Sequence, residues 1–345
     1  MITLKDIAQM TGVNISTVSR ALNDSNEVSD EKKQEIRNIA ASLNYTPNYY
    51  AKALAGKETK TVGVIVPEIS SNYYATMIGA IEMGLQDHGY SLIIGMSHHE
   101  WKLENHYLNV FWNRKVDGIL IAGSMHNEIT PTINRIHSDN IPIVLIHSFI
   151  DYQNYDYVAI DDSYGIGQAI QLFKKQGHRH IGYIASELAS RFRLQILKKI
   201  IHDNGLILNE KHIKIGKEAN EYCGYKYMKE LINEGDMPTA ILAAYDDIAV
   251  GAMRALYEYK YRVPEDISII GYDNIRQSAF LRCPLTTISP PVEKMAKICL
   301  DILFQKIEDK NLKTIQHISL NSELIIREST TKINLGEQQK YNSAS

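Results

Sequence analysis

Residues 3–23 read TLKDIAQMTGVNISTVSRALN, and this stretch decides the fold of the amino-terminal part of the chain. Thr3 is a suitable N-cap, and Asp6 three positions later completes an approximate capping box, so a helix is expected to begin here. Gly12 permits a tight turn, and Asn14 can cap a second helix in the same way. The stretch therefore predicts two short helices joined by a turn.

The apolar residues of this region predict a small shared core, formed by Ile7, Ala8, Val13, Val18 and Leu22. A third helix, capped by Ser29, carries apolar residues at the spacing of one helix face, namely Ile36, Ile39, Ala40 and Leu43. The residues that then point outward from the first turns of the second helix are Ile15, Ser16, Thr17, Ser19 and Arg20. In helix-turn-helix motifs those turns enter the DNA major groove. A three-helix bundle that binds no DNA is the alternative that periodicity alone leaves open.

The charge of this region does not settle that choice. Residues 1–60 hold eight Lys or Arg and seven Asp or Glu side chains, a net charge of +1, whereas a nucleic-acid domain usually shows a clustered basic face. Phosphate contacts are then expected from helix N-termini and neutral donors. The candidate donors are Thr3, Ser19, Asn23, Ser29 and Tyr45. Tight binding would depend on two copies of the domain at each site.

The segment TPNYYAKALAG at residues 46–56 follows the predicted bundle. Pro47 suits a first helical position and Gly56 a helix end, which predicts a helix of about nine residues. A helix of that length is marginal alone in water, because nucleation costs more than two turns return. We therefore expect this segment to fold only against a partner.

The remainder of the chain alternates apolar runs with helical stretches. The clearest runs are residues 62–66, 91–94, 118–121, 143–146, 157–160, 181–184, 239–243 and 267–271. Runs that are apolar on both faces and separated by helices indicate parallel sheets in α/β layers. The length of this part is enough for two domains of ordinary size.

Several segments resemble one known family. They include TLKDIA at 3–8, VNISTVSRALN at 13–23, LNYTPN at 43–48 and PEDISIIGYDN at 264–274. On these residues the chain is similar to repressors of the lactose-repressor (LacI/GalR) family, from its start to about residue 330. The resemblance implies an all-α helix-turn-helix head with a hinge helix, followed by a two-lobed α/β effector domain of the periplasmic-binding-protein type (type I) with a ligand cleft between its lobes.

The resemblance also implies domain boundaries. The expected parts are a DNA-binding head at 1–46, a hinge helix and linker at 47–60, an effector-binding and dimerisation domain at 61–330, and a disordered tail at 331–345. The tail has no heptad repeat, so it is not expected to form a tetramerising coiled coil. A homodimer is the expected assembly.

The hinge helix carries a specific implication of the resemblance. In this family two hinge helices pair in the minor groove at the centre of a palindromic operator, and a leucine from each wedges into the central base step. Leu54 holds that position, with Asn48 and Ala51 on the same helix. An apolar wedge costs unstacking but bends the DNA onto more protein. Double-stranded operator DNA is therefore the expected macromolecular partner.

Six residues are carried over as ligand contacts. Arg193 matches an arginine that grips polar groups of the ligand, and Asp273 matches an acid that accepts hydrogen bonds from sugar hydroxyls. Tyr73 and Tyr74 lie where aromatic cleft residues occur, and the last two candidates are His147 and Tyr245. Two alternatives stay open: Arg193 and Asp273 as a structural ion pair between lobes, and both tyrosines as ordinary half-buried residues.

Several positions depart from the sugar-binding pattern of the family. His147 stands where an aspartate is common and Tyr245 where an asparagine is, while the other two departures are Ala219 and Pro290. Separately, Asn72 replaces the usual proline of the family's first loop. A carbohydrate effector remains the expectation, with a phosphorylated sugar or a purine acting as corepressor as the alternative. The function predicted is that of a repressor whose operator affinity is controlled by this ligand.

Other motifs are weak. Residues 165–170, GIGQAI, imitate a dinucleotide fingerprint without its third small residue, and the histidine clusters at 98–99 and 178–180 lack metal-site spacing. The three cysteines have no CxxC spacing, which fits reduced thiols. We expect no cofactor, no metal and no catalysis, which disfavours an α/β enzyme. No signal segment or membrane span is evident, which disfavours an exported solute-binding protein and predicts a cytoplasmic protein.

Overall fold

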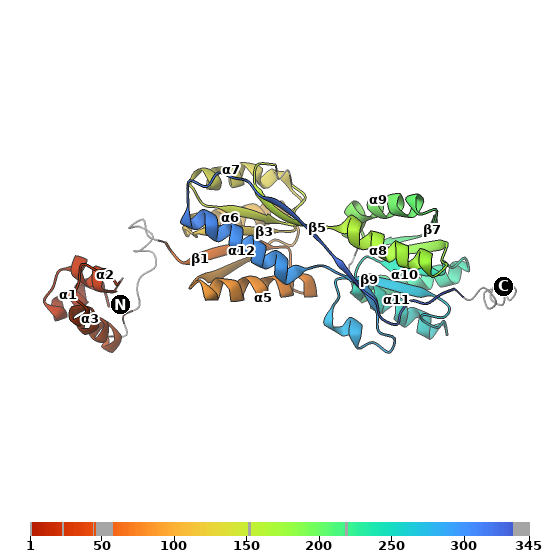
Figure 1. The fold of residues 1–345 in the computed structure, drawn as a ribbon, viewed down its shortest axis with the longest axis horizontal. Coiled ribbons are helices and arrows are strands. Elements are labelled where there is room, and N and C mark those ends of the chain that lie inside the picture. The colour runs from red at the N-terminus through yellow and green to blue at the C-terminus, as the bar shows by residue number, and fades with distance from the viewer. Residues whose placement is uncertain are drawn as a thin grey trace. The chain divides into compact units, whose positions relative to one another are not determined.

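The computed structural model describes residues 2–22, 24–43, 45, 58–150, 153–217 and 220–333, and the chain divides into two compact units at residues 59 and 60. The described residues of the first unit form a bundle of three helices (Figure 1), which are α1 (Leu4–Thr11), α2 (Ile15–Leu22) and α3 (Asp30–Ser42). The predicted capping box is present, since the Asp6 carboxylate accepts the Thr3 N–H at 2.7 Å and the Thr3 hydroxyl accepts the Asp6 N–H at 3.4 Å. Gly12 ends α1 with a φ of 66°, a conformation that favours glycine.

The core of this bundle is small. Its buried apolar members are Ile7, Ala8, Val18, Ala21, Val28, Ile36 and Ala40. Val13 and Leu22, which the sequence predicts as core residues, pack against this cluster while partly buried. The third helix begins as predicted, because the Ser29 hydroxyl accepts the Lys32 N–H. A core of this size depends on each of its large side chains.

The second unit consists of two lobes, each built on a six-stranded sheet. In sequence order the strands of the first sheet are β1 (Thr61–Val66), β2 (Ser91–Met96), β3 (Gly118–Ala122), β4 (Ile143–Ile146), β5 (Asp156–Asp161) and β11 (His317–Asn321). Those of the second sheet are β6 (His180–Ser186), β7 (Ile207–Gly216), β8 (Ala240–Ala243), β9 (Ser268–Tyr272), β10 (Thr286–Ser289) and β12 (Glu323–Ile325). All pairings are parallel except the one between β10 and β12, which confirms the predicted α/β fold.

Helices cover both faces of each sheet. The first lobe carries α5 (Asn72–Asp87), α6 (Trp101–Asn113), η1 (Asn127–Ile129), α7 (Thr130–Ser138) and α12 (Val292–Glu308). The second carries α8 (Asp162–Lys175), α9 (Glu187–Asp203), α10 (Glu221–Glu234), α11 (Asp246–Glu258) and η2 (Arg276–Ala279). The sheet of the first lobe separates two apolar clusters, one under α5 and α12 and the other under α6 and α7. Burial of these apolar faces drives the layered arrangement.

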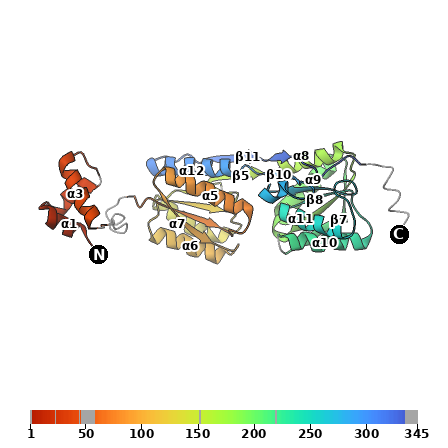
Figure 2. The same cartoon turned by 90° about the horizontal axis from the view of Figure 1, so that it is seen from below.

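The chain crosses between the lobes where β5 leads into α8, where β10 leads into α12, and where β11 leads into β12. Figures 1 and 2 show these segments bridging the two lobes. Parallel strands present their carboxyl ends at one edge of a sheet, and in open α/β sheets that edge holds ligands. The two such edges face one cleft, described below.

Within the described residues, no helix combines the length and the apolar composition that a membrane span requires.

Candidate functional site

The first turn of α2 places several predicted DNA contacts on the surface of the bundle. Asn14, Ile15 and Ser16 are exposed, and Ile15 is an unusual large apolar side chain with 48% of its surface accessible. Thr17 and Ser19 are half-buried beside them. An exposed isoleucine at a helix N-terminus suits contact with an apolar base edge such as the thymine methyl group.

The other predicted contacts of the head have local partners. Arg20 forms an exposed ion pair with Glu27 at 3.0 Å, which costs little to exchange for a phosphate. The hydroxyls of Thr3 and Ser29 serve the N-caps of α1 and α3, and Tyr45 is half-buried against the core. The remaining predictions, Asn23, Asn48, Ala51 and Leu54, lie outside the described residues, as does Ala219.

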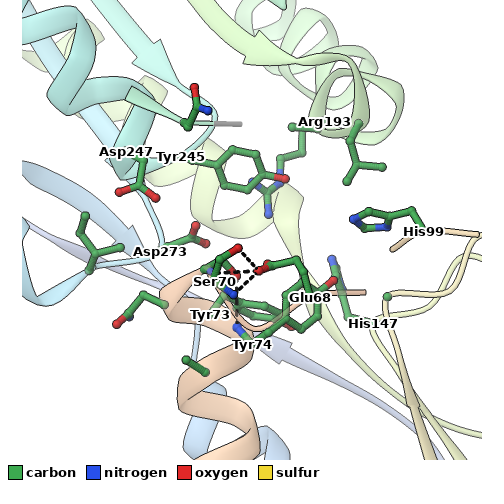
Figure 3. A pocket seen from close by; sticks show the side chains of 18 of the residues that line it. Glu68, Ser70, Tyr73, Tyr74, His99, His147, Arg193, Tyr245, Asp247 and Asp273 are labelled. Carbon is green, nitrogen blue, oxygen red and sulfur yellow. Dashed lines mark hydrogen bonds between the residues drawn. The ribbon is translucent and has the colours of Figure 1, made fainter. Parts of the chain in front are cut away.

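A cleft of about 720 Å³ lies between the lobes of the second unit. All six predicted ligand residues line it, namely Tyr73, Tyr74, His147, Arg193, Tyr245 and Asp273. Figure 3 shows them around one space, with the tyrosines of α5 on the side of the first lobe and Tyr245 and Arg193 on the side of the second. Pro290, one of the departures from the family pattern, is buried and does not line this cleft.

Arg193 is held in place by contacts within the protein. Its Nε donates to the Asp162 Oδ1 at 3.1 Å, and its Nη1 donates to the Ala244 carbonyl at 2.9 Å. The guanidinium lies over the Tyr272 ring, 3.7 Å from the centroid, in a cation–π contact. The ion pair considered from the sequence, between Arg193 and Asp273, is therefore wrong as to its partner, because Asp162 at the start of α8 takes that place.

Asp162 also connects Arg193 to the first lobe. Its carboxylate accepts the Tyr272 hydroxyl at 2.7 Å and lies 3.8 Å from the His147 Nε2. The Ile160 N–H donates to His147 Nδ1, so the proton of the neutral imidazole is on Nε2 and faces Asp162. Burial lowers the pKa of His147, with Asp162 raising it and Arg193 lowering it, so the imidazole is neutral at pH 7. Arg193 and His147 hold the pKa of Asp162 below its usual value despite burial.

Asp273 presents a carboxylate to the cleft without a protein partner. Among the described residues no hydrogen bond or ion pair reaches its side chain, and burial, opposed by Arg193, raises its pKa well above the usual value. Its φ of 106° is rare for a residue with a side chain. The turn is fixed from behind, since Arg327 Nη2 donates to Asn274 Oδ1 at 2.7 Å and the Ile275 N–H donates to Asp246 at 2.9 Å.

Two tyrosines of α5 supply aromatic surface beside these acids. Tyr73 and Tyr74 pack edge to face at 5.0 Å between centroids, after Ser71 has capped the helix. The Tyr74 side chain lies so close to Gly123 that a Cβ added to this glycine would be 2.3 Å from the tyrosine hydroxyl oxygen. A side chain at position 123 would displace the tyrosine ring, and the φ of 66° there also favours glycine.

Sequence reasoning missed many of the residues that line the cleft, among them Glu68, Phe149, Asp162, Phe192 and Asp247. Glu68 and Asp162 follow the ends of β1 and β5, so a search for acids after buried strands would have found both. Asp247 lies in the first turn of α11, directly after the predicted Tyr245 and its neighbour Asp246. The two phenylalanines carry no comparable signal, because each is a single aromatic in a loop or helix.

The remaining motifs do not form a site in the described part of the chain. No cluster of three metal-ligating side chains is present there, and the three cysteines are buried and form no disulfide.

Comparisons with known proteins agree on one kind of relative. The sequence profile of the bacterial regulatory proteins of the lacI family matches residues 3–48, and that of the periplasmic binding protein-like domain matches residues 170–330. The HTH-type transcriptional repressor PurR of Mannheimia succiniciproducens is 33% identical over 96% of this chain and 100% of its own length. The ribose operon repressor of Haemophilus influenzae is 31% identical over 95% of this chain and 98% of its own length.

Solved structures give the same picture. The lac repressor dimer bound to operator and the anti-inducer ONPF superposes with a TM-score of 0.85 at 26% identity, covering 96% of this chain and 99% of that one. A complex of the transcriptional regulator CelR with cellobiose has a TM-score of 0.70 at 25% identity, covering 95% and 100%. A regulator from Enterococcus faecium with bound ribose has a TM-score of 0.68 at 25% identity, covering 79% and 100%.

Proposed function

This chain belongs to the lacI family of bacterial regulatory proteins, and from that premise we propose that it is a repressor whose affinity for a palindromic operator is set by a neutral carbohydrate in the cleft. Membership makes it a DNA-binding transcriptional regulator controlled by a small-molecule effector, and not an enzyme. The operator, the assembly, the contact residues and the identity of the effector are the parts that we propose. A regulator that binds operator DNA acts in the cytoplasm.

We infer a neutral effector from the charged residues that line the cleft. Arg193 is the one lysine or arginine among its described lining residues, and Asp162 already neutralises it. The acids of the lining are Glu68, Asp162, Glu221, Asp247 and Asp273. Burial lowers the pKa of His99 and of His147, so neither imidazole adds a positive charge at pH 7. A phosphate or carboxylate would find no unpaired cation among the described lining residues and would meet the carboxylates of Glu68 and Glu221. Burial raises the pKa of Asp273 and of Asp247, and the hydroxyl groups of a neutral sugar can donate to such a carboxyl group or accept from it.

The aromatic surface supports the same class of ligand. Sugars offer apolar ring faces together with several hydroxyl groups, and Tyr73, Tyr74 and Tyr245 supply apolar surface beside the carboxylates. Two of the similar structures hold cellobiose and ribose, which are neutral sugars. The cleft therefore favours an unphosphorylated carbohydrate over the phosphorylated alternative.

A thermal-shift screen with matched pairs tests this choice. Glucose is compared with glucose 6-phosphate, and ribose with ribose 5-phosphate, together with disaccharides and purine bases. A ligand that binds the native state raises its apparent stability. We expect at least one neutral sugar to raise the unfolding temperature and its phosphate to fail. Stabilisation by a sugar phosphate or a purine, with every neutral sugar inactive, would contradict the proposal.

For DNA binding we propose that α2 enters the major groove, with Ile15 and Ser16 reading base edges. Leu54, outside the described residues, is the proposed minor-groove wedge. Replacing Leu54 by Ala should weaken binding to a palindromic operator much more than binding to non-specific DNA. Titration of both DNAs at one salt concentration measures this difference. An equal loss of affinity for the two DNAs would show that Leu54 is not a wedge at the operator centre.

A homodimer would present two heads to the palindrome, and we propose that its partners meet through the edge of the first sheet. β2 is an edge strand, and its Ile94 and Met96 are exposed on the side that faces α5, where Met83 is 68% exposed. Large exposed apolar side chains grouped at a sheet edge mark an association surface. Ile94→Asp should convert the dimer to a monomer in sedimentation, with Ser138→Ala, an exposed position on α7 at the opposite face of the sheet, as control. An unchanged mass for Ile94→Asp would exclude this face.

The proposed coupling runs through the lobes. A ligand that contacts both lobes changes their relative orientation, and the first lobe continues directly into the linker at Lys60. Coupling free energies of about 1–3 kcal/mol would change operator affinity about 5- to 150-fold.

A further inference from the structure

Two phenylalanines from different lobes stack at one end of the cleft. Phe149 follows β4 in the first lobe, and Phe192 lies on α9 in the second. Their ring centroids are 3.5 Å apart and their planes differ by 12°, so the faces are in van der Waals contact and leave no room between them. The stack is a closed contact between the lobes.

The stack separates two cavities. Phe149 and Phe192 line the 720 Å³ cleft, and both also line a neighbouring cavity of about 460 Å³ that opens widely to solvent. His147, Ile160 and Asp162 are shared in the same way, which places the two cavities side by side. The two rings therefore stand where a ligand would pass from one cavity into the other.

A role in the hydrophobic core does not account for this pair. Neither ring belongs to the buried apolar clusters of the lobes, and 37% of the Phe149 surface is exposed. An aromatic side chain placed at an exposed position and stacked across a cleft costs apolar surface in water. A function in ligand selection would explain its placement.

The second cavity suits a further sugar ring. Ser319 on β11 offers a hydroxyl and Arg191 on α9 an exposed guanidinium, while Tyr157 and Ile196 supply apolar surface. This mixture of hydrogen-bonding and apolar groups matches the two kinds of surface on a pyranose. It has the same character as the lining of the main cleft.

We propose that the Phe149–Phe192 stack is the end wall that sets the longest glycan the cleft accepts, and that the cavity behind it takes one more sugar ring when the wall is opened. This inference rests on the proposed function, since it assumes a neutral carbohydrate effector. Steric exclusion of a longer competitor is a recognised way to build specificity.

The experiment uses the full chain and two ladders of neutral glycans, glucose to maltotetraose and glucose to cellotetraose. Dissociation constants are measured by calorimetry for the wild type, Phe192→Ala and Phe149→Ala. Phe192→Tyr retains a ring at the wall, and Gln195→Ala changes an exposed position on the same helix that lines neither cavity. Two affinities are compared for each protein: that for the longest glycan bound by the wild type and that for the glycan one ring longer. The ratio of the second affinity to the first characterises the protein.

The wall predicts a shift of at least about tenfold in this ratio for both alanine variants, toward the glycan one ring longer than the longest bound by the wild type. Phe192→Tyr and Gln195→Ala should keep the wild-type limit. If glycans bind but the ratio is the same in the wild type and the alanine variants, the wall is refuted and the proposed function stands. If no glycan of the ladders binds any of the proteins while another neutral sugar does, the wall is refuted and the proposed function stands. If no neutral sugar binds at all, both fail.

Discussion

The head and the cleft place their candidate contacts in different ways. The head concentrates its exposed candidates in the first turns of α2, on a core of seven buried apolar side chains. The cleft draws its lining from both lobes, from Glu68 after β1 to Gln277 in η2. A contact on α2 is thus separable from the fold, whereas a side chain such as Arg193 both faces the ligand space and pairs with buried groups of the second lobe. Substitutions on the surface of the head should therefore change DNA recognition alone. Substitutions in the cleft should change both ligand binding and the stability of the second unit.

The largest effect is expected from Arg193→Leu. Removing the guanidinium leaves the buried Asp162 carboxylate without its cation, and breaking a buried ion pair costs about 3–5 kcal/mol. Denaturant unfolding of the second unit should show this loss, together with loss of effector response. Adding Asp162→Asn should restore part of the stability, because the uncompensated charge is removed. If Arg193→Leu were as stable as the wild type, contacts of the cleft could be replaced without loss of stability, as we expect for the contacts on α2.

Asp246 predicts a pH dependence confined to the second unit. Burial raises its pKa to about 7, while hydrogen bonds from Thr287 and the Ile275 N–H oppose that shift. The native state therefore keeps this proton up to about pH 7, whereas the unfolded chain releases it near pH 4. The contribution of this group to the free energy of unfolding is therefore fully present below about pH 4. It is lost as the pH rises to 7, a decrease of at most about 4 kcal/mol.

Asp246→Asn is the matched test, since the amide does not titrate, its oxygen can still accept from the Ile275 N–H, and its NH2 can donate to the Thr287 hydroxyl in place of the bond that Asp246 accepts. The stability difference between wild type and variant should move in favour of the variant from pH 4 to pH 8. A difference that does not change with pH would refute this assignment. The head holds no such group among its described residues, so its unfolding should not show this step.

Replacing Ile15 and Ser16 tests whether contacts of the head can be changed without affecting the cleft. These side chains are exposed, so their replacement should alter operator preference by about 1–3 kcal/mol per base pair and leave effector binding unchanged. Selection from a randomised palindrome reads the preference, and calorimetry reads effector binding. The same preferred operator after the exchange would remove both residues from base recognition.

The smallest effect is expected from Thr3→Ala. The Thr3 hydroxyl caps α1 in a capping box, and loss of such a cap costs about 1 kcal/mol. Thermal unfolding should show a lower transition for the head, whereas the second unit should keep its own. Thr3→Ser retains a capping hydroxyl and should unfold like the wild type. A lower transition in the second unit would argue against independent stability of the two.

Local patterns made much of the fold predictable. The capping box at Thr3, the turn at Gly12 and the apolar runs of the two sheets depend on neighbours close in sequence, and each has the predicted structure. The six ligand candidates came from resemblance and share one cleft. The partner of Arg193 was mistaken, because Asp162 lies 31 positions earlier and meets it only when α8 and α9 pack together in the second lobe. The Phe149–Phe192 stack was missed for a similar reason.

The central claim is that a sugar in the cleft controls occupancy of DNA, and a direct measurement of operator affinity with and without that sugar tests it. Fluorescence anisotropy at fixed salt would use the palindrome selected by the protein and the neutral sugar that gives the largest thermal shift. We predict a change in operator affinity of about 5- to 150-fold, and an equal reciprocal change in sugar affinity when operator is present. Saturation of the cleft with no change in operator affinity would contradict the account.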